Sequence, residues 1–130
     1  MRKFLQNKLW RDNIPDKMRD MGSVIHIKQL TEDAYKACLM DKLVEEVAEV
    51  TAATTQAEVI EEIADVLEVL DAIYKAHGVE KSTIEETKQK KFQERGGFFE
   101  RQFVTIAEHE PGSFGEKYCL AEPEKYPEVA

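Results

Sequence analysis

Two groups of carboxylates near the middle of the sequence have the spacing of a metal site. The first group is Glu45, Glu46 and Glu49, and the second is Glu62 and Asp65. Residues three apart are neighbours on a helix, with Cβ atoms about 5 to 6 Å apart, so each Glu-x-x-acid pair offers two oxygens to one hard cation. Because Mg²⁺ combines a few carboxylates with water and phosphate oxygens, the pattern indicates chemistry on nucleotide di- or triphosphates.

The negative charge of the chain is concentrated around these carboxylates. The 130 residues carry a net charge of -8, but ten acidic residues and one lysine lie between Asp41 and Asp71. The rest of the chain is almost neutral, so a basic nucleic-acid-binding face is disfavoured. Like charges one helical turn apart, such as Glu45 and Glu49, each destabilise a helix by about 0.2 to 0.5 kcal/mol, and a bound cation relieves that repulsion.

Two long amphipathic helices are predicted to position the carboxylates. The first covers about residues 32–53 after an N-cap at Thr31, and the second covers about 56–77 after Thr54 or Thr55. The short connection predicts an antiparallel hairpin, which is half of a four-helix bundle. Either the remaining helix and the N-terminal segment complete the bundle or a second copy of the chain does, and we expect a homodimer.

A third helix is predicted over about residues 83–95, where Ser82 and Glu85 have the spacing of a capping box. Pro15 indicates a turn or helix start near the N-terminus. Short extended segments are expected at residues 24–30 and 98–106. The predicted fold is therefore mostly α, as a single domain over residues 1–130 with a loop-rich tail from about residue 107.

The helical wheel leaves one assignment in the second helix open. Glu62 lies about 20° outside the apolar face, and Asp65 lies about 60° further round. The pair Glu68 and Asp71 has the same spacing, and Asp71 lies about 20° outside the opposite edge of that face. Angles alone do not decide between the two pairs.

Several other functional classes are excluded by ligand spacing. No histidine follows a glutamate by three residues, so a di-iron carboxylate bundle lacks its ligands. Cys38 and Cys119 stand alone, which disfavours a zinc site or a disulfide framework and fits a reducing compartment. No apolar stretch is long enough to span a bilayer, and we expect a soluble cytoplasmic protein.

Three segments in chain order resemble a known family. The letters EEVAE at residues 45–49 and EIAD at 62–65 resemble the EExxE…ExxD signature of MazG-like all-α NTP pyrophosphohydrolases, relatives of the phosphoribosyl-ATP pyrophosphatases. NKLWRDNIP at residues 7–15 is similar to the NKLVRDKIP-type opening of small single-domain members. Residues 91–101, with RGGF at 95–98, are similar to their RGGF…R ending. The context of the EIAD letters also favours Glu62 and Asp65 over the second pair.

The resemblance implies an activity and a ligand set. Members hydrolyse the bond between the α and β phosphates in a Mg²⁺-dependent reaction, with Mn²⁺ as a possible substitute, and release a nucleoside monophosphate and pyrophosphate. Such activity suits house-cleaning of the nucleotide pool by a dimer or a dimer of dimers. The implied metal ligands are Glu46, Glu49, Glu62 and Asp65. Glu46 and Glu49 are also expected to activate the attacking water, and Glu45 to orient it without binding the metal.

Positive side chains in the two flanking motifs are expected to bind the outgoing pyrophosphate. These are Lys8, Arg11, Lys91, Arg95 and Arg101. The alternative interpretation is an acidic helical protein without enzymatic activity that acts as an interaction partner or regulator. An ion-specific response to Mg²⁺ or Mn²⁺ distinguishes the two interpretations.

Overall fold

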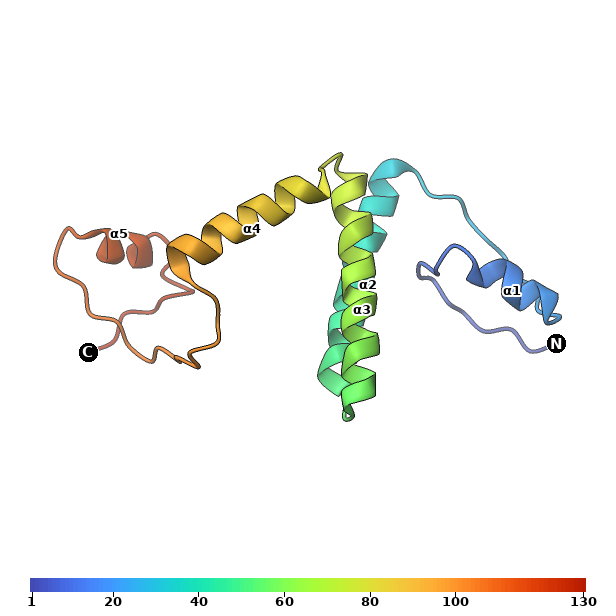
Figure 1. Cartoon of the computed structure of the whole chain (residues 1–130), viewed down its shortest axis with the longest axis horizontal. Helices are drawn as coiled ribbons and strands as arrows, with labels where there is room; N and C mark the ends of the chain where they lie inside the picture. The colour runs from blue at the N-terminus through green and yellow to red at the C-terminus, as the bar shows by residue number, and fades with distance from the viewer. The chain divides into compact units, whose positions relative to one another are not determined.

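The prediction of a mostly α fold is confirmed. The computed structural model describes residues 1–130 and contains five helices and no strand (Figure 1). The helices are α1 (Ile14–Asp20), α2 (Glu32–Ala52), α3 (Gln56–Ala76), α4 (Lys81–Arg95) and α5 (Phe114–Leu120). None of them is both long enough and apolar enough to cross a membrane. The chain divides into two compact units, Met1–Glu94 and Arg95–Ala130, which are described separately.

The first unit is built around the predicted helical hairpin. Helices α2 and α3 lie side by side and antiparallel, joined by the three residues 53–55 (Figure 1). Both helices start where the sequence predicted and end one residue earlier. Thr31 caps α2 by accepting a hydrogen bond from the backbone N–H of Ala34 at 3.3 Å. Leu39 on α2 and Val69 on α3 are the two buried apolar residues of the chain.

Helix α3 is capped at both ends by local hydrogen bonds. Thr55 accepts from the backbone N–H of Glu58 at 3.1 Å, and the Glu58 carboxylate accepts in turn from the backbone N–H of Thr54 at 2.9 Å. That bond from the Thr54 backbone, more than any other contact, lowers the pKa of Glu58. At the other end, Gly78 has a φ of +67°, and the N–H of Val79 donates to the carbonyl of Tyr74.

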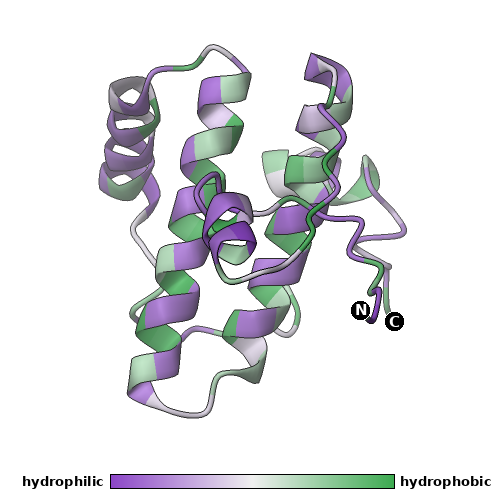
Figure 2. Ribbon diagram, turned by 90° about the vertical axis from the view of Figure 1, so that its right-hand side faces the viewer, coloured by the Kyte–Doolittle hydropathy of each residue, from purple (hydrophilic) through white to green (hydrophobic).

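Much of the apolar surface of the hairpin is exposed. Among the helices of this unit only α2 and α3 pack against each other, so neither α1 nor α4 completes a bundle. Hydrophobic and hydrophilic turns alternate along the long helices (Figure 2). The exposed side chains follow helical spacing and form two stripes, Met40, Val44 and Val47 on α2 and Ile60, Ile63, Leu67 and Leu70 on α3.

The predicted capping box at the start of the third helix is wrong. Helix α4 begins at Lys81, so Ser82 lies inside its first turn. The carbonyl of Glu80 accepts the first helical hydrogen bonds, from the N–H groups of Thr83 and Ile84. Near the N-terminus, α1 starts with Pro15 in its first turn as the sequence indicated. Residues 24–30, predicted as extended, form no strand.

The second unit contains a short helix that the sequence analysis did not identify. Helix α5 follows Ser113, whose side chain accepts from the backbone N–H of Glu116, and the Glu116 carboxylate accepts from the N–H of Gly112. The rings of Phe114, Tyr118 and Tyr126 form a chain with centroids 5.9 and 5.6 Å apart. Residues 98–106, predicted as extended, begin instead with a bend and turn at residues 98–100 and form no strand. The single-domain organisation stays a prediction.

The Glu58 contact predicts a pH-dependent contribution to stability. A carboxylate whose pKa is lowered by folding stabilises the folded state above its ordinary pKa, and this contribution disappears as the pH falls through the folded pKa. Glu58→Gln should therefore lower the melting temperature at pH 7 and lower it less at pH 3, because protonation of Glu58 removes its contribution as the pH falls below the ordinary glutamate pKa of about 4.3 and through the folded pKa. Circular-dichroism melts at constant protein concentration measure the difference, with Glu94→Gln on α4 as the control. An equal loss at both pH values would contradict the assignment.

Candidate metal centre

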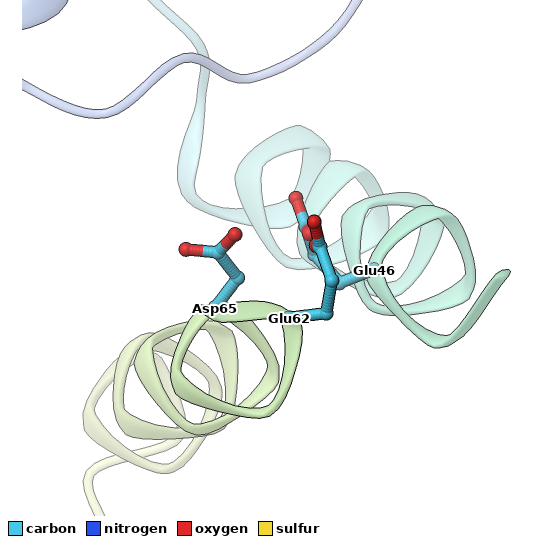
Figure 3. Close-up of side chains that lie close together, drawn as sticks. All are labelled: Glu46, Glu62 and Asp65. Atoms are coloured by element: carbon cyan, nitrogen blue, oxygen red, sulfur yellow. The ribbon is translucent and has the colours of Figure 1, made fainter. Parts of the chain in front are cut away.

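Three carboxylates from the two helices of the hairpin converge. Glu46 comes from α2, and Glu62 and Asp65 come from α3; one oxygen of each lies within 4.8 Å of the others. We refer to these three residues as the acidic cluster. Figure 3 shows their side chains on the same side of the helix pair. The sequence predicted all three as metal ligands, and the antiparallel hairpin brings them together.

Glu46 is the most buried member of the acidic cluster. It is 8% exposed and is the only buried charged residue of the chain, whereas Glu62 and Asp65 are partly exposed. Glu46 lies seven residues, or two turns, after the buried Leu39, so both side chains occupy the same face of α2. A carboxylate at such a position needs a positive partner or a bound cation.

Lys42 is the positive partner of Glu46 within α2. Its ammonium lies 3.1 Å from Glu46 Oε1 and 3.3 Å from Glu45 Oε2. Glu45 also accepts a hydrogen bond from Lys8 at 2.9 Å. This bond is the main reason why the pKa of Glu45 is lowered and that of Lys8 is raised. Glu45 therefore pairs with two lysines. It lies beside the acidic cluster and is not a member of it.

The segment before α1 also contacts α3. Arg11 Nη2 lies 2.6 Å from Asp65 Oδ1, so the N-terminal segment reaches both helices of the hairpin. A cavity of about 290 Å³ lies between the N-terminal segment and the hairpin. It is lined by Trp10, Arg11 and Ile14 on one side and by Lys42, Glu46 and Asp65 on the other. The basic opening motif suggested contacts here, but the participation of Ile14 had no signal in the sequence.

Glu62 is the member of the cluster without a positive partner. Loss of solvent raises its pKa, and the negative charges of Asp65, Glu49 and Glu46 raise it further. A positive charge among these carboxylates would offset the repulsion that contributes to the raised pKa of Glu62. The electrostatics of the cluster therefore favour a cation.

The donor set fits a small divalent cation. All three groups are carboxylates, which Mg²⁺ and Mn²⁺ accept. At a Mg–O distance of about 2.1 Å, two opposite ligands are separated by about 4.2 Å. The oxygens of the cluster span up to 4.8 Å, so small side-chain rotations are enough to bring them into coordination. Glu46, Glu62 and Asp65 can hold such an ion between the helices.

The remaining predicted site residues lie elsewhere. Glu49 is exposed on α2 and outside the acidic cluster, although its charge acts on Glu62. Asp71, from the alternative pair in α3, accepts a hydrogen bond from the hydroxyl of Tyr74 at 2.8 Å and is not in the cluster. Lys91 is exposed on α4.

Two further predicted residues, Arg95 and Arg101, belong to the second unit. Arg101 has a φ of +57°, which is uncommon for a residue with a side chain. Their contribution to binding stays a prediction.

The pairing of Lys42 with a buried carboxylate predicts a measurable loss of stability. Lys42→Met should lower the free energy of unfolding in the absence of divalent cations by about 1 to 3 kcal/mol, because Glu46 then keeps its burial and loses its partner. Lys36→Met is the matched control, since Lys36 pairs with the exposed Glu32 on the same helix. Denaturant unfolding measures both variants. Equal losses of unfolding free energy in the two variants would show that the contact with the buried Glu46 stabilises the chain no more than an exposed ion pair does.

Comparison with known proteins identifies the family of the chain. The phosphoribosyl-ATP pyrophosphohydrolase family matches the chain over residues 13–92, which is more than half its length and includes the whole α2–α3 hairpin. No curated protein and no solved structure matches the chain. The family consists of hydrolases that act on phosphoanhydride bonds of nucleotides, which favours an enzyme over an interaction protein. The chain belongs to the phosphoribosyl-ATP pyrophosphohydrolase family, within the MazG-like all-α NTP pyrophosphohydrolase superfamily.

Proposed function

We propose that the chain is a Mg²⁺-dependent nucleoside triphosphate pyrophosphohydrolase. It hydrolyses the bond between the α and β phosphates and releases a nucleoside monophosphate and pyrophosphate. The observation that supports this most directly is the convergence of Glu46, Glu62 and Asp65 within the segment that matches the family. Phosphoribosyl-ATP is the second candidate substrate, because the family description names it.

The acidic cluster is proposed to act by holding metal. Glu46, Glu62 and Asp65 supply the ligands, and Glu49 joins them by rotating inward from its exposed position one turn after Glu46. When bound, Mg²⁺ neutralises phosphate oxygens and lowers the pKa of a water molecule. Glu46 or Glu49 takes the proton of that water, and Glu45 orients it. The water oxygen bonds to the α-phosphorus while the bond to the bridging oxygen breaks.

Basic residues are proposed to bind the leaving pyrophosphate. Lys8 and Arg11 are the nearest candidates, because their contacts with Glu45 and Asp65 hold them beside the acidic cluster. Three more from the ending motif are proposed for the same role, namely Lys91, Arg95 and Arg101. Positive side chains that bind the pyrophosphate stabilise the negative charge that develops on the leaving group.

The second copy of the chain is proposed to cover the exposed stripes of the hairpin. Val44 is 71% exposed and Ile60 62%, and both lie in stripes that continue along their helices. Contiguous apolar surface of this kind marks an interface, and two such hairpins make a four-helix bundle. A cytoplasmic location is also proposed, since Cys38 and Cys119 are both free thiols.

Substitution of the ligands should separate the proposed site from the alternative pair in α3. Glu46→Gln and Glu62→Gln should each reduce Mg²⁺-dependent pyrophosphate release by about a hundredfold or more, because a lost ligand removes several kcal/mol of transition-state stabilisation. Asp71→Asn is the control and should keep most of the activity. The assay compares pyrophosphate with free phosphate over canonical and modified NTPs, dNTPs and phosphoribosyl-ATP. Full activity of either glutamine variant would refute the assignment.

The dimer should depend on the exposed stripes. Wild-type protein at micromolar concentration should have twice the mass of one chain in light scattering coupled to size exclusion. The double variant Ile60→Glu and Leu67→Glu should be monomeric, because two charges per chain would enter the apolar interface. Ile84→Glu on α4 introduces a similar charge outside the stripes and should leave the dimer intact. A monomeric wild type would rule the interface out.

A further inference from the structure

Basic side chains of the chain itself pair with two members of the acidic cluster. Lys42 pairs with Glu46 at 3.1 Å, and Arg11 pairs with Asp65 at 2.6 Å. Because Asp65 is a proposed ligand, the guanidinium of Arg11 and a cation at the acidic cluster would share one carboxylate.

The two positive partners differ in how easily they can leave. Lys42 lies on α2 one turn before Glu46, and the helix keeps it there whatever else binds. Arg11 belongs to irregular chain before α1, and its partner is 54 residues away in the sequence. The Arg11 side chain is 56% exposed, so it can turn into solvent without breaking any packed core. Arg11 is thus the exchangeable partner.

We propose that Arg11 exchanges between Asp65 and the adjoining cavity when a cation binds at the acidic cluster. The proposal rests on the metal site of the proposed function. A doubly charged ion about 2.1 Å from a carboxylate oxygen attracts it more strongly than a guanidinium at hydrogen-bond distance, and it repels that guanidinium. Arg11 therefore leaves Asp65, and the segment around Trp10 moves with it.

The exchange places a new anion donor next to the cluster. The cavity of about 290 Å³ is lined by Trp10, Arg11, Glu46 and Asp65, so a guanidinium that leaves Asp65 can stay beside the acidic cluster, on the solvent-open side of the cavity. Arginine binds phosphate oxygens through two parallel N–H donors. Cation binding would therefore prepare the site for a phosphate group, and the cation would bind before the anion.

Trp10 allows the exchange to be observed without any enzymatic assay. It is the only tryptophan of the chain, it precedes Arg11 and it lines the same cavity. Quenching of its fluorescence by acrylamide, a neutral molecule, measures its exposure. With MgCl₂ the quenching constant of the wild type should rise to a plateau that NaCl of equal ionic strength does not produce. Metal-free Arg11→Ala should already show the plateau value.

Titration calorimetry with Mn²⁺ measures directly whether Arg11 and the cation compete for Asp65. Arg11→Ala should bind Mn²⁺ about two- to fivefold more tightly than the wild type, because an ion pair of this exposure competes by that much. Lys8→Ala removes the same charge from the same segment but frees Glu45, which is outside the cluster, so its affinity should change less. Arg11→Lys keeps a competing charge and should resemble the wild type.

Each result separates the exchange from the proposed activity. Unchanged or weaker Mn²⁺ binding by Arg11→Ala would overturn the exchange, as would equal tightening in Lys8→Ala, which would indicate a general effect of charge. Mn²⁺ binding by the wild type without a change in Trp10 quenching would also overturn the exchange while leaving the metal site intact. Failure of the wild type to bind Mn²⁺ would overturn the metal site and the exchange together.

Discussion

Mutual repulsion among carboxylates is the constraint on which the rest of the structure depends. Two unpaired carboxylates about 4 Å apart repel each other by about 4 kcal/mol at an effective dielectric constant of about 20. Glu46, Glu62 and Asp65 are held at comparable distances by two helices that pack directly against each other. The hairpin must supply enough packing to oppose the repulsion, and Lys42 and Arg11 reduce it. The carboxylates of the acidic cluster therefore repel one another in the folded chain, and a bound cation would lower that repulsion.

Helix α3 carries apolar residues on one side and the acidic residues of the cluster on another. Its inner face carries Val69, which is buried against α2, and Glu62 and Asp65 point toward the acidic cluster. The exposed stripe from Ile60 to Leu70 is left for another surface. In the proposed function, the exposed stripe of α3 serves the dimer interface, and the acids on another side of the same helix serve the metal site.

The hairpin could be predicted from local spacing, whereas the three members of the acidic cluster were predicted as ligands from the family resemblance. Helix periodicity and the caps Thr31 and Thr55 located α2 and α3 to within one residue. The helical wheel could not choose between the pairs Glu62/Asp65 and Glu68/Asp71, since Glu62 and Asp71 each lie about 20° outside an edge of the apolar face. The structure separates them through tertiary contacts, with Asp65 facing Glu46 and Asp71 hydrogen-bonded to Tyr74. The ion pair between Arg11 and Asp65 was beyond prediction because no periodicity relates residues so far apart.

Capping motifs show the limit of local patterns. Ser82 with Glu85 and Ser113 with Glu116 have the same spacing, yet only Ser113 caps a helix. Gly112, with a φ of +78°, turns the chain immediately before Ser113 and leaves its side chain free to accept. Ser82 has no such turn before it, and Glu80 starts the helix instead. The motif therefore works where the preceding backbone already breaks the helix.

The sequence separation of the ion pairs also has a consequence for the order of folding. The hairpin closes through only three residues, whereas Lys8 and Arg11 reach their partners across 37 and 54 residues. Closing longer loops costs more chain entropy, so the hairpin forms before the N-terminal segment arrives. At that stage Lys42 is the one positive charge already in place beside Glu46, because it lies on the same helix. Because Lys42 is already beside Glu46, it can reduce the repulsion among the three carboxylates before Lys8 and Arg11 reach the hairpin.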